Sequence, residues 1–134
     1  MIYIDANIFV SAITGDHQTK SLITQVITGK LKASTSLLSW DEFIWALRKY
    51  LNKDQIILES KNFLLFPNLI FLDISPNIIG RAHELMETYG IHPRDAIHAA
   101  SALCNGITEI SSEDTHFDKI KELKRISLKD LKLN

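Results

Sequence analysis

The stretch Ile2–Asn7, IYIDAN, places a short apolar, β-rich run directly before an acidic residue. Such runs usually form buried strands, so we expect a strand over 2–4 that ends at Asp5. Four further segments are predicted as strands, the first of them rich in serine and threonine and the last very short. They cover residues 33–38, 69–72, 107–110 and 125–127.

Helices are predicted between these strands because apolar residues recur there at the spacing of one helix face. The clearest start is Ser75-Pro76, a capping side chain followed by proline at the first helical position, and Gly90 is the predicted end of that helix. Because strands and helices alternate, the sequence predicts an α/β fold with a mostly parallel sheet between helical layers, and residues 1–134 are expected to form one domain. The other helices are expected at 8–15, 22–29, 39–51, 54–66, 93–105 and 117–123.

The composition is typical of a globular protein with no excess of either charge. Of 134 residues, 46% are hydrophobic and 23% are charged, and the formal net charge is -1. A polycation is therefore excluded, so contact with nucleic acid would need a local basic patch or a bound metal ion. The N-terminus does not resemble a signal peptide, and no apolar run approaches the ~20 residues that span a bilayer. We expect a cytoplasmic protein that makes no membrane contact.

Cys104 is the only cysteine. A single cysteine excludes an intrachain disulfide and a cysteine-based zinc motif. Because Cys104 ends the alanine-rich run 99–104, we predict a buried and unreactive thiol.

Four acidic residues are predicted to lie at strand ends or helix starts. In open parallel sheets, ligands bind beyond the carboxyl ends of the strands. Asp5 and Asp114 follow the first and fourth predicted strands, while Glu42 and Asp95 lie in the first turns of helices. If these side chains meet at one edge of the sheet, they form a carboxylate cluster of the kind that binds Mg2+ or Mn2+. Such an ion can activate water against a phosphodiester.

Each of these acids also has a purely structural explanation. Acidic side chains are favoured in the first turn of any helix, where they interact with free backbone amides. The run Ser39–Glu42 matches a capping box, in which Glu42 would only contact the Ser39 amide. Asp5 and Asp114 could likewise act as helix caps. The spacing alone leaves both explanations open.

Four ordered blocks of the sequence, taken together, resemble the PIN-domain family, and the short length without extra domains looks most like its VapC-type toxins. The first block resembles the family's opening strand with its Asp-x-Asn, and the second contributes the acid of the helix after the second strand. The third is similar to an Asp-Ala-x-x-Ala-Ala helix, and the last to a Ser/Thr-x-Asp-x-x-Phe turn. The blocks are Tyr3–Phe9, Ser39–Glu42, Arg94–Ala100 and Ser111–Phe117.

The resemblance implies a three-layer α/β/α sandwich and an endonuclease that cleaves RNA. It implies a Mg2+ or Mn2+ site built by the four acids, with Asn7 and Ser112 as supporting polar groups. It further implies the toxin of a type II toxin–antitoxin pair, usually a homodimer that a small antitoxin protein holds inactive. The residues that would bind the metal and carry out the reaction are Asp5, Glu42, Asp95 and Asp114.

The sequence departs from the family at His116, where many members carry another acid. Asp118 lies close behind and could replace that acid, although a solvated position is the stronger expectation. His98 shares a helix face with Asp95, and we expect it to form a core or interhelical hydrogen bond. Asp41 and Glu113 are expected to face solvent or to cap helices.

Basic and aromatic side chains provide candidate RNA contacts without sequence specificity. The basic side chains are equally compatible with an ordinary solvated surface that carries common ion pairs. Trp40 and Trp45 could stack on bases, but we expect Trp45 to pack in a core or in a groove for a partner helix. The basic candidates are Lys30, Lys32, Arg48, Lys49, Lys53 and Arg94.

Two other functions are compatible with the sequence. The chain could be a catalytically weak PIN-like protein-interaction module that retains the acids. It could also be a phosphohydrolase with Asp5 as the nucleophile, although that chemistry normally needs an acid at the position of Asn7. We rank the nuclease first.

Overall fold

The computed structural model describes residues 1–131, so the last three residues of the predicted domain lie outside the described part. In this part the strands form one parallel sheet with the order β3-β2-β1-β4-β5. β1 is central, and β2 and β4 are its neighbours. The strands are β1 (Ile2–Ile4), β2 (Ala33–Ser36), β3 (Leu69–Leu72), β4 (Glu109–Ser111) and β5 (Lys124–Ile126).

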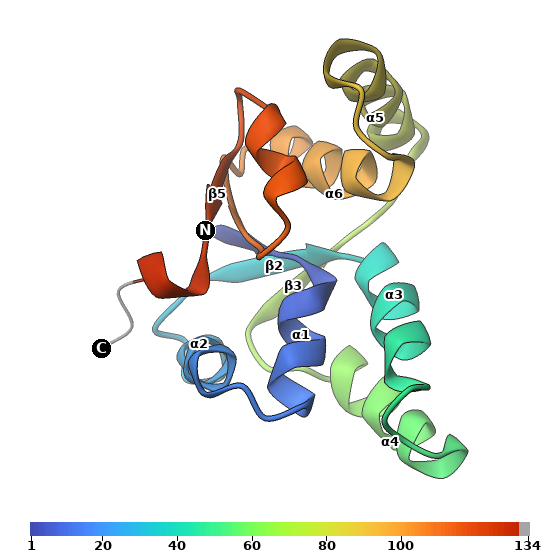
Figure 1. Ribbon diagram of the computed structural model, residues 1–134, viewed down its shortest axis with the longest axis vertical. Coiled ribbons are helices and arrows are strands. Elements are labelled where there is room, and N and C mark those ends of the chain that lie inside the picture. Colours follow the sequence, from blue (N-terminus) through green and yellow to red (C-terminus); the bar gives the residue numbers. More distant parts are fainter. Residues whose placement is uncertain (132–134) are drawn as a thin grey trace.

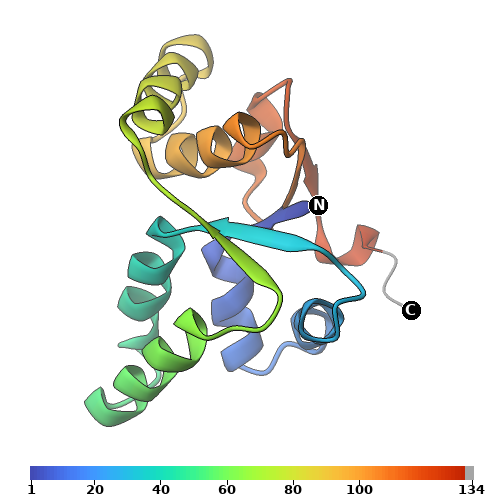
Figure 2. The same ribbon diagram turned by 180° about the vertical axis from the view of Figure 1, so that it is seen from behind.

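Helices cover both faces of this sheet. Figure 1 and the reverse view in Figure 2 show α5 and α6 on one face and α1 to α4 on the other. The predicted three-layer α/β/α sandwich is therefore confirmed. The helices are α1 (Ala6–Ile13), α2 (His17–Ile27), α3 (Leu38–Leu47), α4 (Lys53–Leu64), α5 (Pro76–Tyr89) and α6 (Pro93–Cys104), with short 3-10 turns η1 (Thr115–Lys119) and η2 (Leu128–Asp130).

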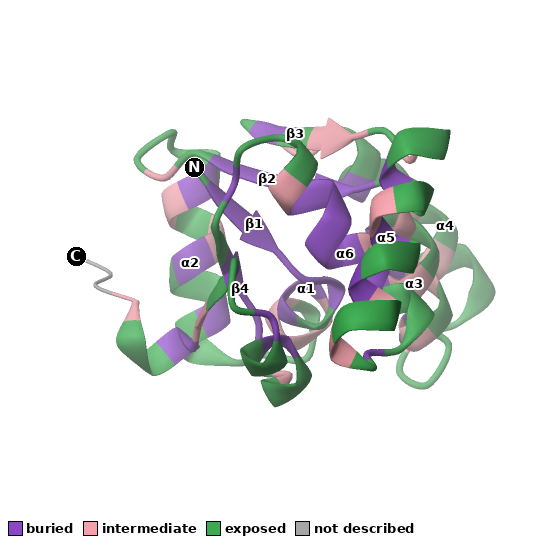
Figure 3. Ribbon diagram, turned by 90° about the horizontal axis from the view of Figure 1, so that it is seen from above, coloured by how far each residue is buried: buried purple, intermediate pink, exposed green. Residues whose placement is uncertain are grey.

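The central strand β1 contributes to both halves of the hydrophobic core. Tyr3 packs with α5 and α6, whereas Ile2 and Ile4 point into the layer of α1 to α4, as the alternation of a strand requires. All three side chains are buried, and β1 lies among buried segments in Figure 3. In the half of the core formed with α1 to α4, Phe63 stacks on Phe43 with ring centroids 4.8 Å apart.

The predicted boundaries of α5 are confirmed. The Ser75 hydroxyl accepts a hydrogen bond from the Ile78 amide, and Pro76 is the first helical residue. Gly90 ends the helix with a φ of 66°, in the left-handed region that glycine adopts without strain.

The prediction for the start of α3 is wrong. The helix begins at Leu38, so β2 ends at Ser36, and the Ser36 hydroxyl accepts a hydrogen bond from the Leu38 amide. Ser39 is therefore inside the helix, where its buried hydroxyl is bonded to Thr35 at 2.6 Å. The proposed capping box does not form, and Glu42 is free to project elsewhere. The helix also ends at Leu47 rather than at residue 51 because the chain turns there.

The prediction of a buried Cys104 is also wrong. It is the last residue of α6 and its thiol is exposed, because the chain turns away toward β4 at this point. We therefore expect Cys104 to react with a thiol reagent in the native protein about as fast as a model peptide thiol. The rate of modification by a chromogenic disulfide measures this directly. A reaction that needs denaturant would contradict the exposed position.

Among the described residues, no helix is both long enough and apolar enough to cross a membrane.

Candidate active site

The topology places a crevice where β1 and β4 end side by side. The chain runs outward from β1 to β2 and β3, then returns to add β4 on the other side of β1. Ligands bind at such a switch point, outside the carboxyl ends of the strands. Asp5 directly follows β1 and Ser112 directly follows β4. Because Ile4 pairs with Ser111, Asp5 and Ser112 lie at the same level of the sheet.

Asp5 is both a helix cap and a member of the acidic cluster. It is only 7% exposed, and its Oδ1 accepts a hydrogen bond from the Ala6 amide at 2.7 Å. Its Oδ2 accepts a hydrogen bond from the Ser112 hydroxyl, also at 2.7 Å, and that hydroxyl in turn accepts one from the Asp114 amide at 3.0 Å. Ser112 thus connects the two acids that follow β1 and β4. The capping and site explanations of Asp5 are compatible.

The four predicted acids line one cavity of about 400 Å³. Glu42 reaches it from α3, and Asp95 from the first turn of α6. Asn7 is exposed and also lines the cavity. The lining residues are Asp5, Ala6, Asn7, Val10, Ser11, Glu42, Ala46, Lys49, Tyr50, Asp95 and Asp114.

The acids at this cavity disfavour one another's negative charge. Burial raises the pKa of Asp5, although His98 and Ser112 partly oppose this. Burial also raises the pKa of Asp95, and the nearby carboxylates of Asp114 and Asp5 raise it further. A divalent cation would favour the charged form of both carboxyls, because it supplies positive charge to oxygen donors that are already close together.

His98 contacts two of the four acids but does not itself line the cavity. It is buried, with its Nδ1 2.6 Å from the Tyr3 hydroxyl and its Nε2 hydrogen-bonded to Glu42. The same Nε2 is 3.7 Å from Asp5 Oδ1. Burial lowers the pKa of His98, but Tyr3, Glu42 and Asp5 outweigh this and raise it to about 10. The expected hydrogen bond between helices is present, whereas its second partner, Tyr3, was not predicted.

His116 contacts the other pair of acids. Its Nδ1 is 3.1 Å from Asp114 Oδ1 and 3.6 Å from Asp95 Oδ2. Within residues 1–131, two groups therefore offer ligand atoms that all lie within 4.8 Å of one another, Asp5–Glu42–His98 and Asp95–Asp114–His116. The sequence position of His116, two residues after Asp114, could have indicated this contact.

The neighbouring acids behave as solvated or capping groups. Asp118 is paired with Arg125, with the closer oxygen 3.0 Å from the guanidinium, so it does not join the cluster. Glu113 is exposed and accepts a hydrogen bond from the Leu128 amide at 2.7 Å, which caps η2. Asp41 is exposed on α3.

Some predicted RNA contacts lie near the acids. Lys49 lines the acidic cavity, and Arg94 lines an adjoining hollow with Asp41, Glu42 and Trp45. Trp45 is exposed rather than packed in a core, with the Arg48 guanidinium over its ring. Of the two packing positions expected for Trp45, the core is wrong because α3 turns this side chain outward, and a groove for a partner helix stays a prediction.

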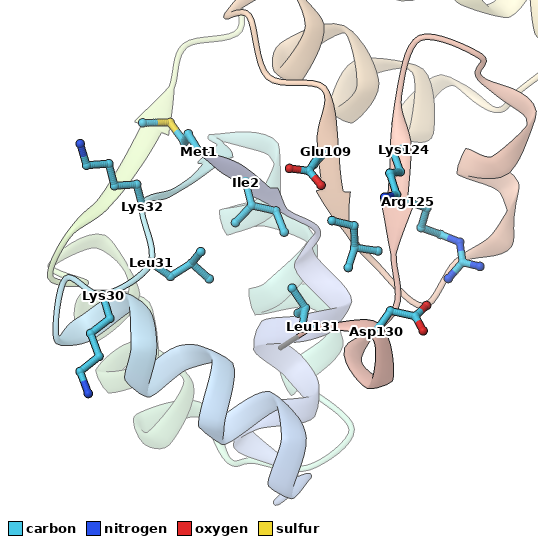
Figure 4. Close-up of a pocket in the computed structure, with 11 residues that line it drawn as sticks. Met1, Ile2, Lys30, Leu31, Lys32, Glu109, Lys124, Arg125, Asp130 and Leu131 are labelled. Atoms are coloured by element: carbon cyan, nitrogen blue, oxygen red, sulfur yellow. The ribbon is translucent and has the colours of Figure 1, made fainter. Parts of the chain in front are cut away.

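Lys30 and Lys32 lie far from the acids. They line a larger hollow of about 750 Å³ at the opposite ends of the strands, where β1 and β2 begin (Figure 4). Its acidic side chains, Glu109 and Asp130, stand apart on β4 and η2. This hollow therefore does not share the chemistry of the smaller, acidic one.

Comparisons with known proteins agree with this geometry. The PIN domain family model matches residues 2–123. A toxin–antitoxin complex from Klebsiella pneumoniae contains a chain of similar fold, with a TM-score of 0.74, 20% identity, and coverage of 98% of this chain and 100% of that one. VapBC2 from Rickettsia felis, bound to a DNA fragment from its promoter, gives a TM-score of 0.74 and 21% identity over 95% and 98% of the two chains.

A third similar structure is VapC20 from Mycobacterium tuberculosis, described as a toxin that cleaves the sarcin–ricin loop. Its TM-score is 0.72 with 14% identity, over 90% of this chain and 95% of that one. A search of curated protein sequences gave no match.

Proposed function

Because the chain belongs to the PIN-domain family, we propose that it is a metal-dependent endoribonuclease whose active site is the acidic cavity at the end of β1 and β4. The observation that carries this proposal is that acids from four distant segments line the same cavity. Structural capping explains Asp5 and Asp114 individually, but it does not explain why Glu42 and Asp95 face them.

The donors present suit Mg2+ or Mn2+, which prefer carboxylate oxygens. When bound, such an ion supplies a more acidic water and positive charge against the phosphodiester. Asp5, Asp95 and Asp114 would hold the ion, and Glu42 would bind it or orient the attacking water. Ser112 fixes the Asp5 carboxylate through its hydroxyl, and Asn7 presents a polar amide at the cavity wall.

We further infer that the protein is the toxin of a type II toxin–antitoxin pair. Several structures of similar fold are VapBC or other toxin–antitoxin complexes, which supports an antitoxin protein as partner. A homodimer is also proposed. Light scattering of the purified chain, alone and with the product of a neighbouring small gene, tests both assemblies.

Asp95→Asn should abolish the metal response while preserving the fold, since it removes a charge and retains the shape. The purified chain should cleave RNA with Mg2+ or Mn2+ and stop when EDTA is added. Calorimetry should detect Mn2+ binding to the wild type but not to Asp95→Asn. Asp54→Asn, an exposed acid on α4, is the matched control and should bind and cleave like the wild type. Equal cleavage by all three proteins would contradict the proposed site.

Exposed apolar residues on α4 favour a second function as an interaction module. Ile57, Leu58 and Leu65, the last just behind the helix, are largely exposed to solvent. A protein contact surface would explain them. Binding of a partner with neither Mn2+ binding nor cleavage would support this alternative.

A further inference from the structure

A continuous chain of hydrogen bonds runs from the backbone of β2 to the Glu42 carboxylate. The Ser36 amide donates to the Tyr3 hydroxyl at 3.0 Å, and that hydroxyl is 2.6 Å from His98 Nδ1. His98 Nε2 contacts Glu42 at the cavity. Tyr3 and His98 are 0% and 1% exposed, so only the Glu42 end of this chain reaches solvent.

The contacts of the His98 ring place a hydrogen on Nε2 in both its neutral and its charged form. An amide can only donate, so the Tyr3 oxygen accepts from Ser36 and its own hydrogen is available for His98 Nδ1. A neutral imidazole that accepts at Nδ1 carries its hydrogen at Nε2, where it can donate to the Glu42 carboxylate. An imidazolium carries hydrogen at both nitrogens. In both forms Nε2 retains its hydrogen.

The opposite arrangement would leave buried polar atoms unpaired. A hydrogen at Nδ1 alone would point a bare Nε2 at the Glu42 carboxylate, so two acceptors would meet. Buried groups without partners are strongly disfavoured.

We infer that His98 is a positioning residue for Glu42 and that it does not bind the metal. This inference rests on the proposed function insofar as Glu42 acts in the metal site. Glu42 needs such support because it is the only glutamate among the four acids, and its longer side chain has one more rotatable bond than an aspartate. The contact from α6 restricts this freedom and sets the angle at which Glu42 enters the cavity.

Nitrogen-15 NMR of the intact chain tests the direction of the hydrogen bonds without any enzyme assay. The His98 ring signals are identified by their loss in His98→Gln. We expect hydrogen at Nε2 in the metal-free protein and after addition of Mg2+.

Two results would overturn the inference. One is a His98 Nε2 without hydrogen in the metal-free protein, because it could then not donate to Glu42. The other is a direct cadmium–nitrogen coupling when 113Cd2+ replaces Mg2+, because His98 would then be a ligand. Both readouts remain available if the protein does not cleave RNA.

Mn2+ affinity distinguishes positioning from general structural support. His98→Gln places an amide donor close to the position of Nε2, whereas His98→Asn is too short to reach Glu42. We expect His98→Asn to lose roughly 10- to 100-fold in Mn2+ affinity or kcat, as is usual for partners of metal ligands, and His98→Gln to recover most of it. Equal losses in the two variants, or none in either, would contradict the inference. His83→Gln, an exposed histidine on α5, is the control.

Failure of the positioning role and failure of the proposed function give different results in these measurements. If the wild type binds no Mn2+ and cleaves no RNA, the nuclease proposal fails, while the NMR spectrum still shows whether His98 Nε2 carries hydrogen. If the wild type binds and cleaves but His98→Asn does so equally well, the proposed function stands and the positioning role fails.

Discussion

Asp5→Asn is expected to lower RNA cleavage roughly 100- to 1,000-fold, the loss usual on removing one electrostatic group from an active site, and also to stabilise the metal-free protein. Burial and Glu42 raise the pKa of Asp5, so its charged form is disfavoured in the metal-free fold. Asparagine is neutral and can still accept from the Ala6 amide. The same change should therefore have opposite effects on stability and on activity.

The stability gain should depend on pH in a defined direction. An acid whose pKa is raised on folding contributes stability below its unfolded pKa, which is 3.8 for Asp5, and loses this contribution as pH rises through the folded value. The advantage of Asp5→Asn over the wild type should thus be small in acid and grow toward neutral pH. Urea titrations in EDTA at several pH values measure this difference. An advantage that shrinks as pH rises would contradict the assignment.

Saturating Mn2+ should make the wild type more stable than Asp5→Asn, which reverses the order expected without metal. Binding at 100 times Kd stabilises a folded protein by about 2.7 kcal/mol, which for a chain of this size raises Tm by on the order of 10 °C. Only the wild type should respond. Asp54→Asn controls for the loss of one surface charge. An equal rise of Tm in Asp5→Asn would place the metal elsewhere.

Phe63→Ala is expected to destabilise the fold by about 3–5 kcal/mol, a large part of the 5–15 kcal/mol typical of a domain. Phe63 is 3% exposed, stacks on Phe43, and meets Phe9 and Phe71 edge to face at 5.0 and 5.3 Å between ring centroids. Its removal would leave a cavity between α4 and the sheet that these rings cannot easily fill.

Leu65→Ala provides the control, since Leu65 is two residues away and 69% exposed. It should change stability by no more than about 0.5 kcal/mol. Equilibrium urea unfolding measures both variants. A loss below about 1 kcal/mol for Phe63→Ala would show that the aromatic cluster is not packed as described.

The elements that the sequence predicted well carry their own local signals. β1 is a continuous apolar run and α5 has a capping serine, a proline and a terminal glycine, so local chemistry determined their limits. The start of α3 was misplaced because Ser39 was expected to cap the helix, whereas it lies inside it. The Ser39 hydroxyl bonds to Thr35, which also donates to the Ile4 carbonyl across the sheet. Such a contact between strands leaves no local trace.

The candidate site was predictable as a set of residue types but not as a network. Strand ends placed Asp5 and Asp114, helix starts placed Glu42 and Asp95, and the resemblance to the family favoured a metal site for all four. The partnership of Tyr3 with His98 could not be predicted, because it joins residues 95 positions apart through the tertiary fold. A tyrosine inside an otherwise aliphatic strand was the available hint, since a buried hydroxyl needs a partner.

The hydrogen bond between Asp5 and Ser112 spans 107 residues of sequence. During synthesis on the ribosome, the N-terminal acids therefore emerge long before the segment that completes their surroundings. A nascent chain, or one cut short before β4, lacks both Ser112 and Asp114 and cannot close the cavity. For a protein proposed to cleave RNA, this order of emergence delays any activity until the segment that carries Ser112 and Asp114 has been translated.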